Sequence, residues 1–172
     1  MLQPIIAPQS SHVPMAPRLS RPTGLVPGTL VRTPEGELPV EYLLAGDKVY
    51  TVNNGIVEIR GTSVVEVTEI DMISIAPTAF GGEHGRPSRD LEVPFSQQIL
   101  VKDWRAQLHG EDSILTPASS LVDNVKVRRE SRENVRLIRL HFDQPQVIWA
   151  DGIEIASART RAPITRSIGL LH

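Results

Sequence analysis

Short runs of β-branched and other apolar residues, separated by turn-forming pairs, constrain this chain more than any other feature. The clearest case is segment 47–60, where two alternating runs flank Asn54-Gly55. Asn-Gly accepts the positive φ angles of a tight turn, so this segment predicts a β-hairpin. Asp151-Gly152 lies between two later runs of the same kind and predicts a second hairpin.

The rest of the chain continues this pattern. Further strands are predicted at residues 29–33, 62–70, 72–75, 97–104 and 135–142. Helix is scarce: a single turn is predicted over 116–122, with Thr116 as N-cap and Pro117 at the first helical position. Many strands with turns between them indicate an all-β barrel or folded sheet and exclude a series of βαβ units.

Composition limits the function classes. The chain has 172 residues with 40% hydrophobic and 4% aromatic content, which predicts one domain with an aliphatic core. A net charge of −2 argues against a dedicated nucleic-acid binder, and no apolar stretch reaches the ~20 residues of a membrane span. The chain lacks cysteine, which excludes disulfides, thiolate metal sites and a cysteine nucleophile.

Three regions are predicted along the chain. Residues 1–23 are Pro-rich and predict a flexible tail without the pattern of a signal peptide, so a cytoplasmic setting is the default expectation. Residues 24–157 form the β domain, and residues 158–172 form a basic tail. The arginines of both tails are interpreted as solvated, and attraction to an acidic partner is the alternative.

The start of the β domain carries a recognisable series of motifs. Residues 25–49 read LVPGTLVRTPEGELPVEYLLAGDKV, which contains Pro27-Gly28-Thr29, Pro39-Val40-Glu41 and Gly46-Asp47. This order resembles the Hint (hedgehog/intein) family, and segments 57–61, 89–101, 104–122 and 142–157 resemble its bacterial subgroup. The resemblance implies a flattened horseshoe of short antiparallel strands and a self-cleaving activity.

The positions that carry the family's chemistry depart from its pattern. The family's nucleophile, a Cys or Ser that attacks the preceding carbonyl, falls at Gly24, which has no side chain. The four positions of its Ser/Thr-x-x-His motif are Pro94, Phe95, Ser96 and Gln97, and glutamine cannot exchange a proton near neutral pH. A later histidine falls at Pro145, and the terminal His-Asn pair of splicing members falls at Ala156 and Ser157. We therefore expect no self-cleavage.

The other reactive side chains of the chain each have a structural interpretation. Thr29 and Ser96 are the candidate substitute nucleophiles, interpreted as a strand residue and a turn cap. The histidines, which are His12, His84, His109, His141 and His172, share no ligand spacing, so no metal is expected. The acids Glu111, Asp112 and Asp123 are interpreted as solvated turn residues. The run 126–139 is interpreted as a mixed-charge hairpin, with a stripe for a phosphate polymer as the alternative.

These observations predict a non-catalytic binding or structural module that presents its sheet surface or cleft to a protein partner. We expect it to need no cofactor and to bind neither nucleic acid nor a membrane. The alternative is a residual autoproteolytic protein that uses Ser96 or Thr29. A degenerate remnant without a selected role is the third possibility.

Overall fold

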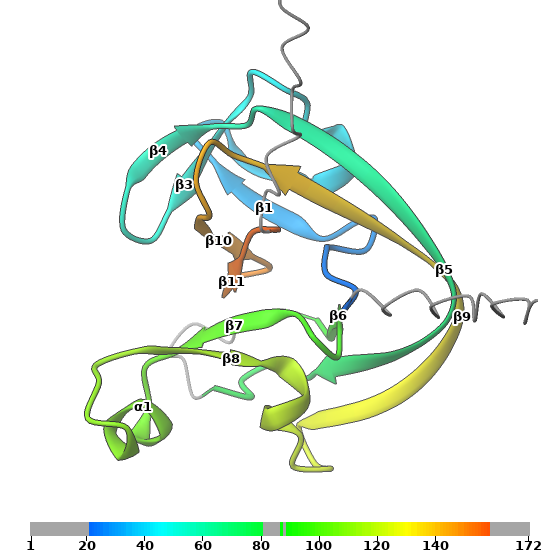
Figure 1. The fold of residues 1–172 in the computed structure, drawn as a ribbon, viewed down its shortest axis with the longest axis vertical. Coiled ribbons are helices and arrows are strands. Elements are labelled where there is room, and N and C mark those ends of the chain that lie inside the picture. Colours follow the sequence, from blue (N-terminus) through cyan, green and yellow to red (C-terminus); the bar gives the residue numbers. More distant parts are fainter. Residues whose placement is uncertain (1–20, 81–86, 88, 159–172) are drawn as a thin grey trace, which may run out of the picture.

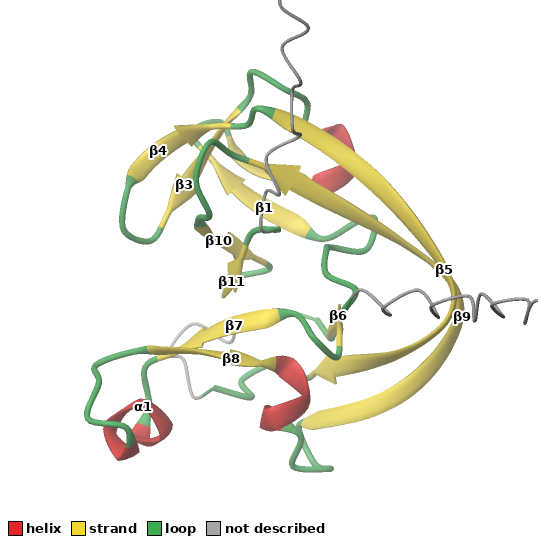
Figure 2. Ribbon diagram, in the orientation of Figure 1, coloured by secondary structure: helices red, strands yellow, loops and turns green. Residues whose placement is uncertain are grey.

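The structure is a computed structural model, and it describes residues 21–80, 87 and 89–158. Within these ranges the regular secondary structure is mostly β-strand, joined by loops and short helical turns (Figure 2). The strands are β1 Leu30–Thr33, β2 Gly36–Pro39, β3 Lys48–Thr51, β4 Gly55–Glu58, β5 Gly61–Ile75, β6 Leu91–Pro94, β7 Gln98–Val101, β8 Ile114–Pro117, β9 Val127–His141, β10 Val147–Ala150 and β11 Ile153–Ala156. The predicted all-β fold is confirmed.

The strands form two antiparallel sheets. The larger sheet has the strand order β2-β1-β10-β11-β7-β8, with β3 paired to β10 and β4 paired to β3. The smaller sheet has the order β6-β5-β9. Figure 1 shows how the curved pair β5 and β9 runs along one side of the molecule from one lobe to the other. The result is an open, bent shape of the kind that the family resemblance implies.

The β5–β9 pair is one continuous ladder of two 15-residue strands. Its register runs from Gly61 opposite His141 to Ile75 opposite Val127. It is interrupted between the pairs Val67–Val135 and Glu69–Glu133, where Asn134 has a positive φ of 55°. An asparagine tolerates this backbone conformation better than most residues, which permits the local distortion without ending either strand.

This ladder corrects two predictions. The segments 62–70 and 72–75 are one strand, because Asp71 between them pairs with Ser131 and does not form a turn. The mixed-charge run 126–139 is a strand and not a hairpin. Arg129, Arg132 and Arg136 pair with acids of the neighbouring strands β5 and β6, with Arg129 3.5 Å from Asp71. These exposed ion pairs form across strands, so they carry no information about a local turn.

Both predicted hairpins are present. β3 and β4 pair from Lys48–Glu58 to Thr51–Gly55, and β10 and β11 pair from Val147–Ala156 to Ala150–Ile153. The second turn is as predicted, because Asp151 and Gly152 both have positive φ. The first turn differs, because only Gly55 has positive φ and the Thr51 hydroxyl accepts a hydrogen bond from the Asn54 N–H at 3.0 Å.

The helical prediction is wrong in part. Residues Ile114–Pro117 form β8, and a 3-10 turn begins only at Ala118 and ends at Leu121, so Thr116 is a strand residue and Pro117 precedes the turn. The sequence interpretation missed α1, Trp104–Leu108, because it extended the preceding strand to Trp104. The Asp103 carboxylate caps this helix by accepting a hydrogen bond from the Arg105 N–H at 2.9 Å.

The core is aliphatic, as the low aromatic content predicts. It is one large cluster to which nearly every strand contributes, including Val31, Val49, Ile73 and Ile148. Phe142 is the only aromatic side chain among the largest fully buried ones of the described residues. A second, small cluster of Ile70, Met72 and Leu137 lies on the ladder itself. In the described part of the chain, no helix is long and apolar enough to cross a membrane.

The ladder contains a testable defect. Glu69 and Glu133 are directly opposite each other and both are exposed, and like charges in this arrangement destabilise a sheet. We expect Glu133→Lys to raise the free energy of unfolding by about 0.2–1 kcal/mol, because it replaces repulsion by attraction. Chemical denaturation measures the change. Glu111→Lys, which makes the same charge change in an exposed loop, is the control, and an equal gain in both variants would contradict the interpretation.

Candidate functional site

The segment that precedes β1 lies between the two lobes, where it joins strand β9 (Figure 1). Leu25 and Ile138 exchange two backbone hydrogen bonds, of 2.9 and 2.8 Å. Gly24 and Leu25 are both buried. The peptide bond between Thr23 and Gly24, at which the family resemblance puts the chemistry, is therefore held in the interior next to the ladder.

Side chains from two other parts of the chain hold this peptide on both sides. The Arg139 Nε of β9 donates a hydrogen bond to the Thr23 carbonyl at 2.9 Å. The Gly24 N–H donates to the Gln97 Oε1 at 3.0 Å. One residue earlier, the Pro22 carbonyl accepts from the Ser96 hydroxyl. Three consecutive backbone groups are thus fixed in position by side chains.

Gln97 lies in the turn between β6 and β7 and is 2% exposed. Its Nε2 donates to the Ala156 carbonyl at 2.8 Å and to the Gln98 carbonyl at 3.2 Å. Because two carbonyls accept from the nitrogen, the oxygen must face the Gly24 N–H. Gln97 therefore offers an acceptor to the Gly24 nitrogen and no proton, which is the opposite of what an acid catalyst supplies to a leaving amine.

Gly24 is packed more closely than most residues that carry a side chain. Its φ is 135°, which is in the region that side chains rarely adopt. A Cβ added here would lie 3.0 Å from the Ile138 carbonyl oxygen and 3.1 Å from the Leu137 Cβ. The first neighbour is backbone in a ladder strand and cannot move aside freely. A side chain here would therefore strain the backbone and push its neighbours aside by a few tenths of an ångström.

The space around the peptide is small. A cavity of about 20 Å³ lies here, with Gly24, Gln97, Arg139 and Ala156 among its lining residues. A volume of this size holds no more than about one water-sized group. The chain's own segment therefore fills the site, and the remaining room is too small for a substrate.

The other positions implied by the resemblance have structural contacts. Pro94 is a buried end of β6, and Pro145 is exposed. Ser157 forms two hydrogen bonds with Gln146, one from the Gln146 N–H to the Ser157 hydroxyl at 2.9 Å and one from the Ser157 N–H to the Gln146 carbonyl at 2.7 Å. The sequence interpretation missed Arg139 and Gln146, because only the tertiary structure brings them to this site.

The candidate substitute nucleophiles have no basic partner among the described residues. The Ser96 hydroxyl donates to the Pro22 carbonyl, so it holds a segment that is distant in sequence and does not cap the turn that contains it. The Thr29 hydroxyl is buried without a hydrogen-bond partner. Thr29 precedes β1 and is not part of it. Neither hydroxyl therefore has the adjacent base that activates a serine or threonine.

A different hydroxyl lies beside a histidine. The Ser63 Oγ and the His141 Nε2 are 2.7 Å apart on the β5–β9 ladder. Neither residue lines the cavity beside Gly24. Desolvation, with the neighbouring positive charge of Arg139, lowers the pKa of His141 from its ordinary value. In the neutral ring, the His141 Nε2 either accepts a hydrogen bond from the Ser63 hydroxyl or donates one to it, depending on the tautomer.

The structure does not bring the other candidate histidines and acids together in one site. His12, His84 and His172 lie outside the described residues, and His109 is exposed after α1. Among the described residues, no group of three or more His, Asp or Glu side chains could hold a metal ion. The Asp123 carboxylate accepts hydrogen bonds from the backbone N–H groups of Val127 and Val125, which lower its pKa, and this is a turn-capping role.

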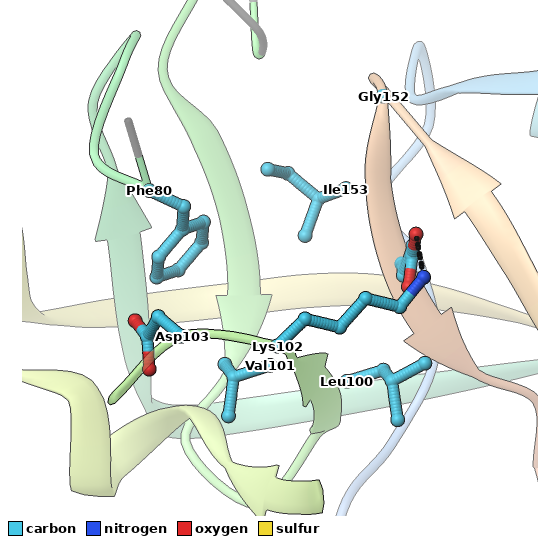
Figure 3. A pocket seen from close by; sticks show the side chains of 8 residues that line it. Phe80, Leu100, Val101, Lys102, Asp103, Gly152 and Ile153 are labelled. Carbon is cyan, nitrogen blue, oxygen red and sulfur yellow. Dashed lines mark hydrogen bonds and ion pairs between the residues drawn. The ribbon is translucent and has the colours of Figure 1, made fainter. Parts of the chain in front are cut away.

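A hollow of about 280 Å³ lies where β7 and β11 meet the segment around Phe80, and Lys102 and Glu154 are among its lining residues. Figure 3 shows the extended side chain of Lys102 in this hollow. The Lys102 Nζ is 3.0 Å from the Glu154 Oε1. The Glu154 Oε2 is buried without a hydrogen-bond partner. Because the Lys102 cation already neutralises this carboxylate, the hollow has no uncompensated charge.

The Ser63–His141 contact predicts a pH dependence. A folded-state pKa below the unfolded value means that the unfolded chain binds more protons, so stability falls as the pH drops below about 6.5 toward the lower folded pKa. His141→Gln keeps an acceptor for Ser63 and does not titrate, so it should lose this part of the pH dependence in urea denaturation. His109→Gln is the control and should behave as the wild type. An identical pH profile for all three proteins would contradict the assignment.

Comparison with known proteins identifies the fold and the family. The family model described as "Hint domain" matches residues 23–162. A bacterial intein-like domain from Clostridium thermocellum aligns with a TM-score of 0.55 at 19% identity, covering 80% of this chain and 99% of that domain. A DnaB intein from Synechocystis sp. gives a TM-score of 0.55 at 9% identity, again covering 80% of this chain and 99% of the intein.

A splice-inactive variant of the AceL NrdHF class 3 split intein aligns with a TM-score of 0.51 at 14% identity, covering 80% of this chain and 98% of that protein. No curated protein matches the chain. At these identities the solved structures support the shared fold alone, whereas the family model covers most of the sequence. The chain therefore belongs to the Hint domain family.

Proposed function

We propose that this chain is a Hint-fold module that has lost self-cleavage and acts as a non-catalytic binding or structural unit. The packing of Gly24 carries the proposal. In the family chemistry a side chain at this position attacks the carbonyl of Thr23, and the Gly24 nitrogen would leave as an amine. Glycine supplies no attacking atom, and a Cβ would meet the Ile138 carbonyl oxygen at 3.0 Å.

The hydrogen bonds around the peptide support the same proposal. Cleavage needs a proton for the leaving nitrogen, and Gln97 presents an acceptor to that nitrogen. Turning the Gln97 amide around would cost free energy, because the Gln97 Nε2 would lose its hydrogen bond to the Ala156 carbonyl. The site therefore stabilises an intact peptide bond, and the residues that hold it act as a clamp.

A clamp of this kind suits a structural role. It fixes Pro22, Thr23 and Gly24 to the centre of the molecule, so the chain is anchored at a defined point before β1. Because the chain's own segment fills the site, a partner protein has to be bound elsewhere, and the outer sheet surface is the face available to it.

Residual autoproteolysis with Ser96 or Thr29 is the second candidate, and one observation favours it. The Arg139 guanidinium donates to the Thr23 carbonyl, and a positive donor at this place would also stabilise the oxyanion of a tetrahedral intermediate. The candidate lacks a base for either hydroxyl, which is why we rank it second.

The first test is self-cleavage. A reporter domain fused before residue 1 and incubated with thiol should remain attached, because nothing in the site attacks Thr23. Intact-mass spectrometry measures this, with a thiol-cleaved Hint fusion in parallel as the control for conditions. A fragment ending at Thr23 would refute the proposal. A cut that disappears in Ser96→Ala or Thr29→Val would instead establish the second candidate.

The second test addresses the packing of Gly24. We expect Gly24→Ala to lower the free energy of unfolding by about 1–3 kcal/mol, because the position combines an unfavourable φ with a close backbone contact. Gly61→Ala is the matched control, since nothing lies within 4 Å of a Cβ there. That variant should be neutral or slightly stabilising. Equal effects of the two substitutions in chemical denaturation would show that Gly24 is not required.

A further inference from the structure

We propose that the open edge of β5, from Thr62 to Thr68, binds a partner protein by accepting one extended, basic segment of that partner as an added strand. This inference rests on the proposed function, because it names the surface and the class of partner through which a non-catalytic module would bind. Strand addition takes its affinity from main-chain hydrogen bonds and its specificity from alternate side chains. The backbone of β5 therefore has to offer free donors and acceptors.

The first half of β5 has a neighbouring strand on one side only. β9 pairs along the length of β5, whereas β6 pairs only with the segment from Met72 to Ile75. In the part of the chain that the structure describes, no strand pairs with the other edge of β5 between Thr62 and Thr68. Figure 1 shows this half of β5 on one side of the molecule, between the two lobes.

Ile138 determines which backbone groups of β5 face this open edge. Ile138 is opposite Val64 in the ladder, yet its N–H and C=O are both hydrogen-bonded to Leu25 on its other side. In an antiparallel pair both backbone groups of one residue point to the same side, and consecutive residues alternate. Val64 and Ile138 therefore share no hydrogen bond, and the N–H and C=O groups of Thr62, Val64 and Glu66 point away from β9.

These backbone groups are available to a partner. Among the described residues, none is hydrogen-bonded to the backbone of Thr62, Val64 or Glu66 on the open side. The side chains of these three residues are exposed, and Val64 is 51% exposed. The segment from Thr62 to Thr68 also contains no proline or lysine, which are residues that commonly protect an edge strand from pairing.

The charge of β5 indicates the chemistry of the added strand. The segment 61–75 contains Glu66, Glu69 and Asp71 and has no Lys or Arg. Asp71 has a partner in Arg129, at 3.5 Å. The contact of Glu66 with Arg136 is long, 3.9 Å, and joins two exposed side chains, so it contributes little. A strand that carries Lys or Arg would therefore find uncompensated negative charge along this edge.

Glu69 supports the same partner. It lies directly opposite Glu133, and like charges in this arrangement repel each other. A cationic side chain on an added strand would relieve this repulsion. A second copy of the chain, paired through the same edge, would instead bring its own Glu66 and Glu69 to this short segment and increase the repulsion. The edge therefore fits a basic strand better than it fits itself.

NMR of the isotope-labelled protein tests the inference with two probes. One is the peptide acetyl-Thr-Lys-Val-Lys-Val-Lys-Thr-amide, and its acidic match is acetyl-Thr-Glu-Val-Glu-Val-Glu-Thr-amide. We expect the Lys peptide to bind saturably at millimolar concentration and the Glu peptide to bind at least about tenfold more weakly. The bound Lys peptide should slow amide exchange of Val64 and Glu66, which gain acceptors, and leave that of Val65, which already faces β9, unchanged.

Matched variants locate the binding edge. Val64→Pro removes one edge-facing N–H and no hydrogen bond to β9, so it should weaken binding of the Lys peptide by about tenfold or more. Val64→Thr keeps the N–H and a β-branched side chain, and it should bind as the wild type does. Glu66→Gln should weaken binding by about two- to fivefold, as the loss of an exposed charge pair does. Glu111→Gln, in an exposed loop, should not.

Equal affinity for the two peptides, no saturable binding, or unchanged exchange at Val64 and Glu66 would each overturn the inference. Full binding by Val64→Pro would do the same, and the exchange measurement on the wild type decides if that variant does not fold. Slow exchange at Val64 that depends on protein concentration without peptide would assign the edge to a second copy and also overturn it. The self-cleavage assay is independent, so failure here leaves the proposed loss of self-cleavage standing.

Discussion

The antiparallel pairing of β5 and β9 is the interaction on which the rest of the structure depends. These two strands belong to the smaller sheet, yet they extend along both lobes (Figure 1). One end of the ladder packs Ile73, Ile75 and Val127 into the main core, and the other end packs Ile138 and Leu140 into the same core. Without this continuous pairing, the short strands of four residues would have no common support, because two-stranded hairpins are marginal on their own.

The ladder also determines the chemistry of the central site. Ile138 pairs with Leu25 through its backbone while its neighbour Arg139 reaches the Thr23 carbonyl. Strand β9 therefore supplies both the Ile138 carbonyl oxygen that would crowd a Cβ at Gly24 and the Arg139 cation that donates to the Thr23 carbonyl. The backbone at Gly24 lies close to that of β9 because Leu25 pairs with Ile138. This close approach causes no side-chain crowding, because glycine has no Cβ.

Local features of the fold were predictable from the sequence, and long-range features were not. Asp151-Gly152 specifies its turn through its own backbone preferences, so the second hairpin followed directly. The continuity of β5 past Asp71 depends on Ser131, a partner sixty residues away, and no local pattern reveals it. Likewise, Gln97 was identifiable as a departure from the family motif. Its role as an acceptor from Gly24 depends on the Ala156 and Gln98 carbonyls. Arg139 was indistinguishable from the paired arginines of its strand.

Under the proposed function, the site is not one substitution away from activity. Replacing Gln97 by histidine would restore a titratable group but remove an amide that satisfies the Ala156 carbonyl. Replacing Gly24 by a nucleophile would require the segment or strand β9 to move, since both Ile138 and Leu137 lie within about 3 Å of the new Cβ. Each of these substitutions would therefore lower the free energy of unfolding, and neither alone would be sufficient for cleavage. The packing and the missing side chains therefore point in the same direction. Under the proposed function, substitutions on the outer surface would alter binding without restoring self-cleavage.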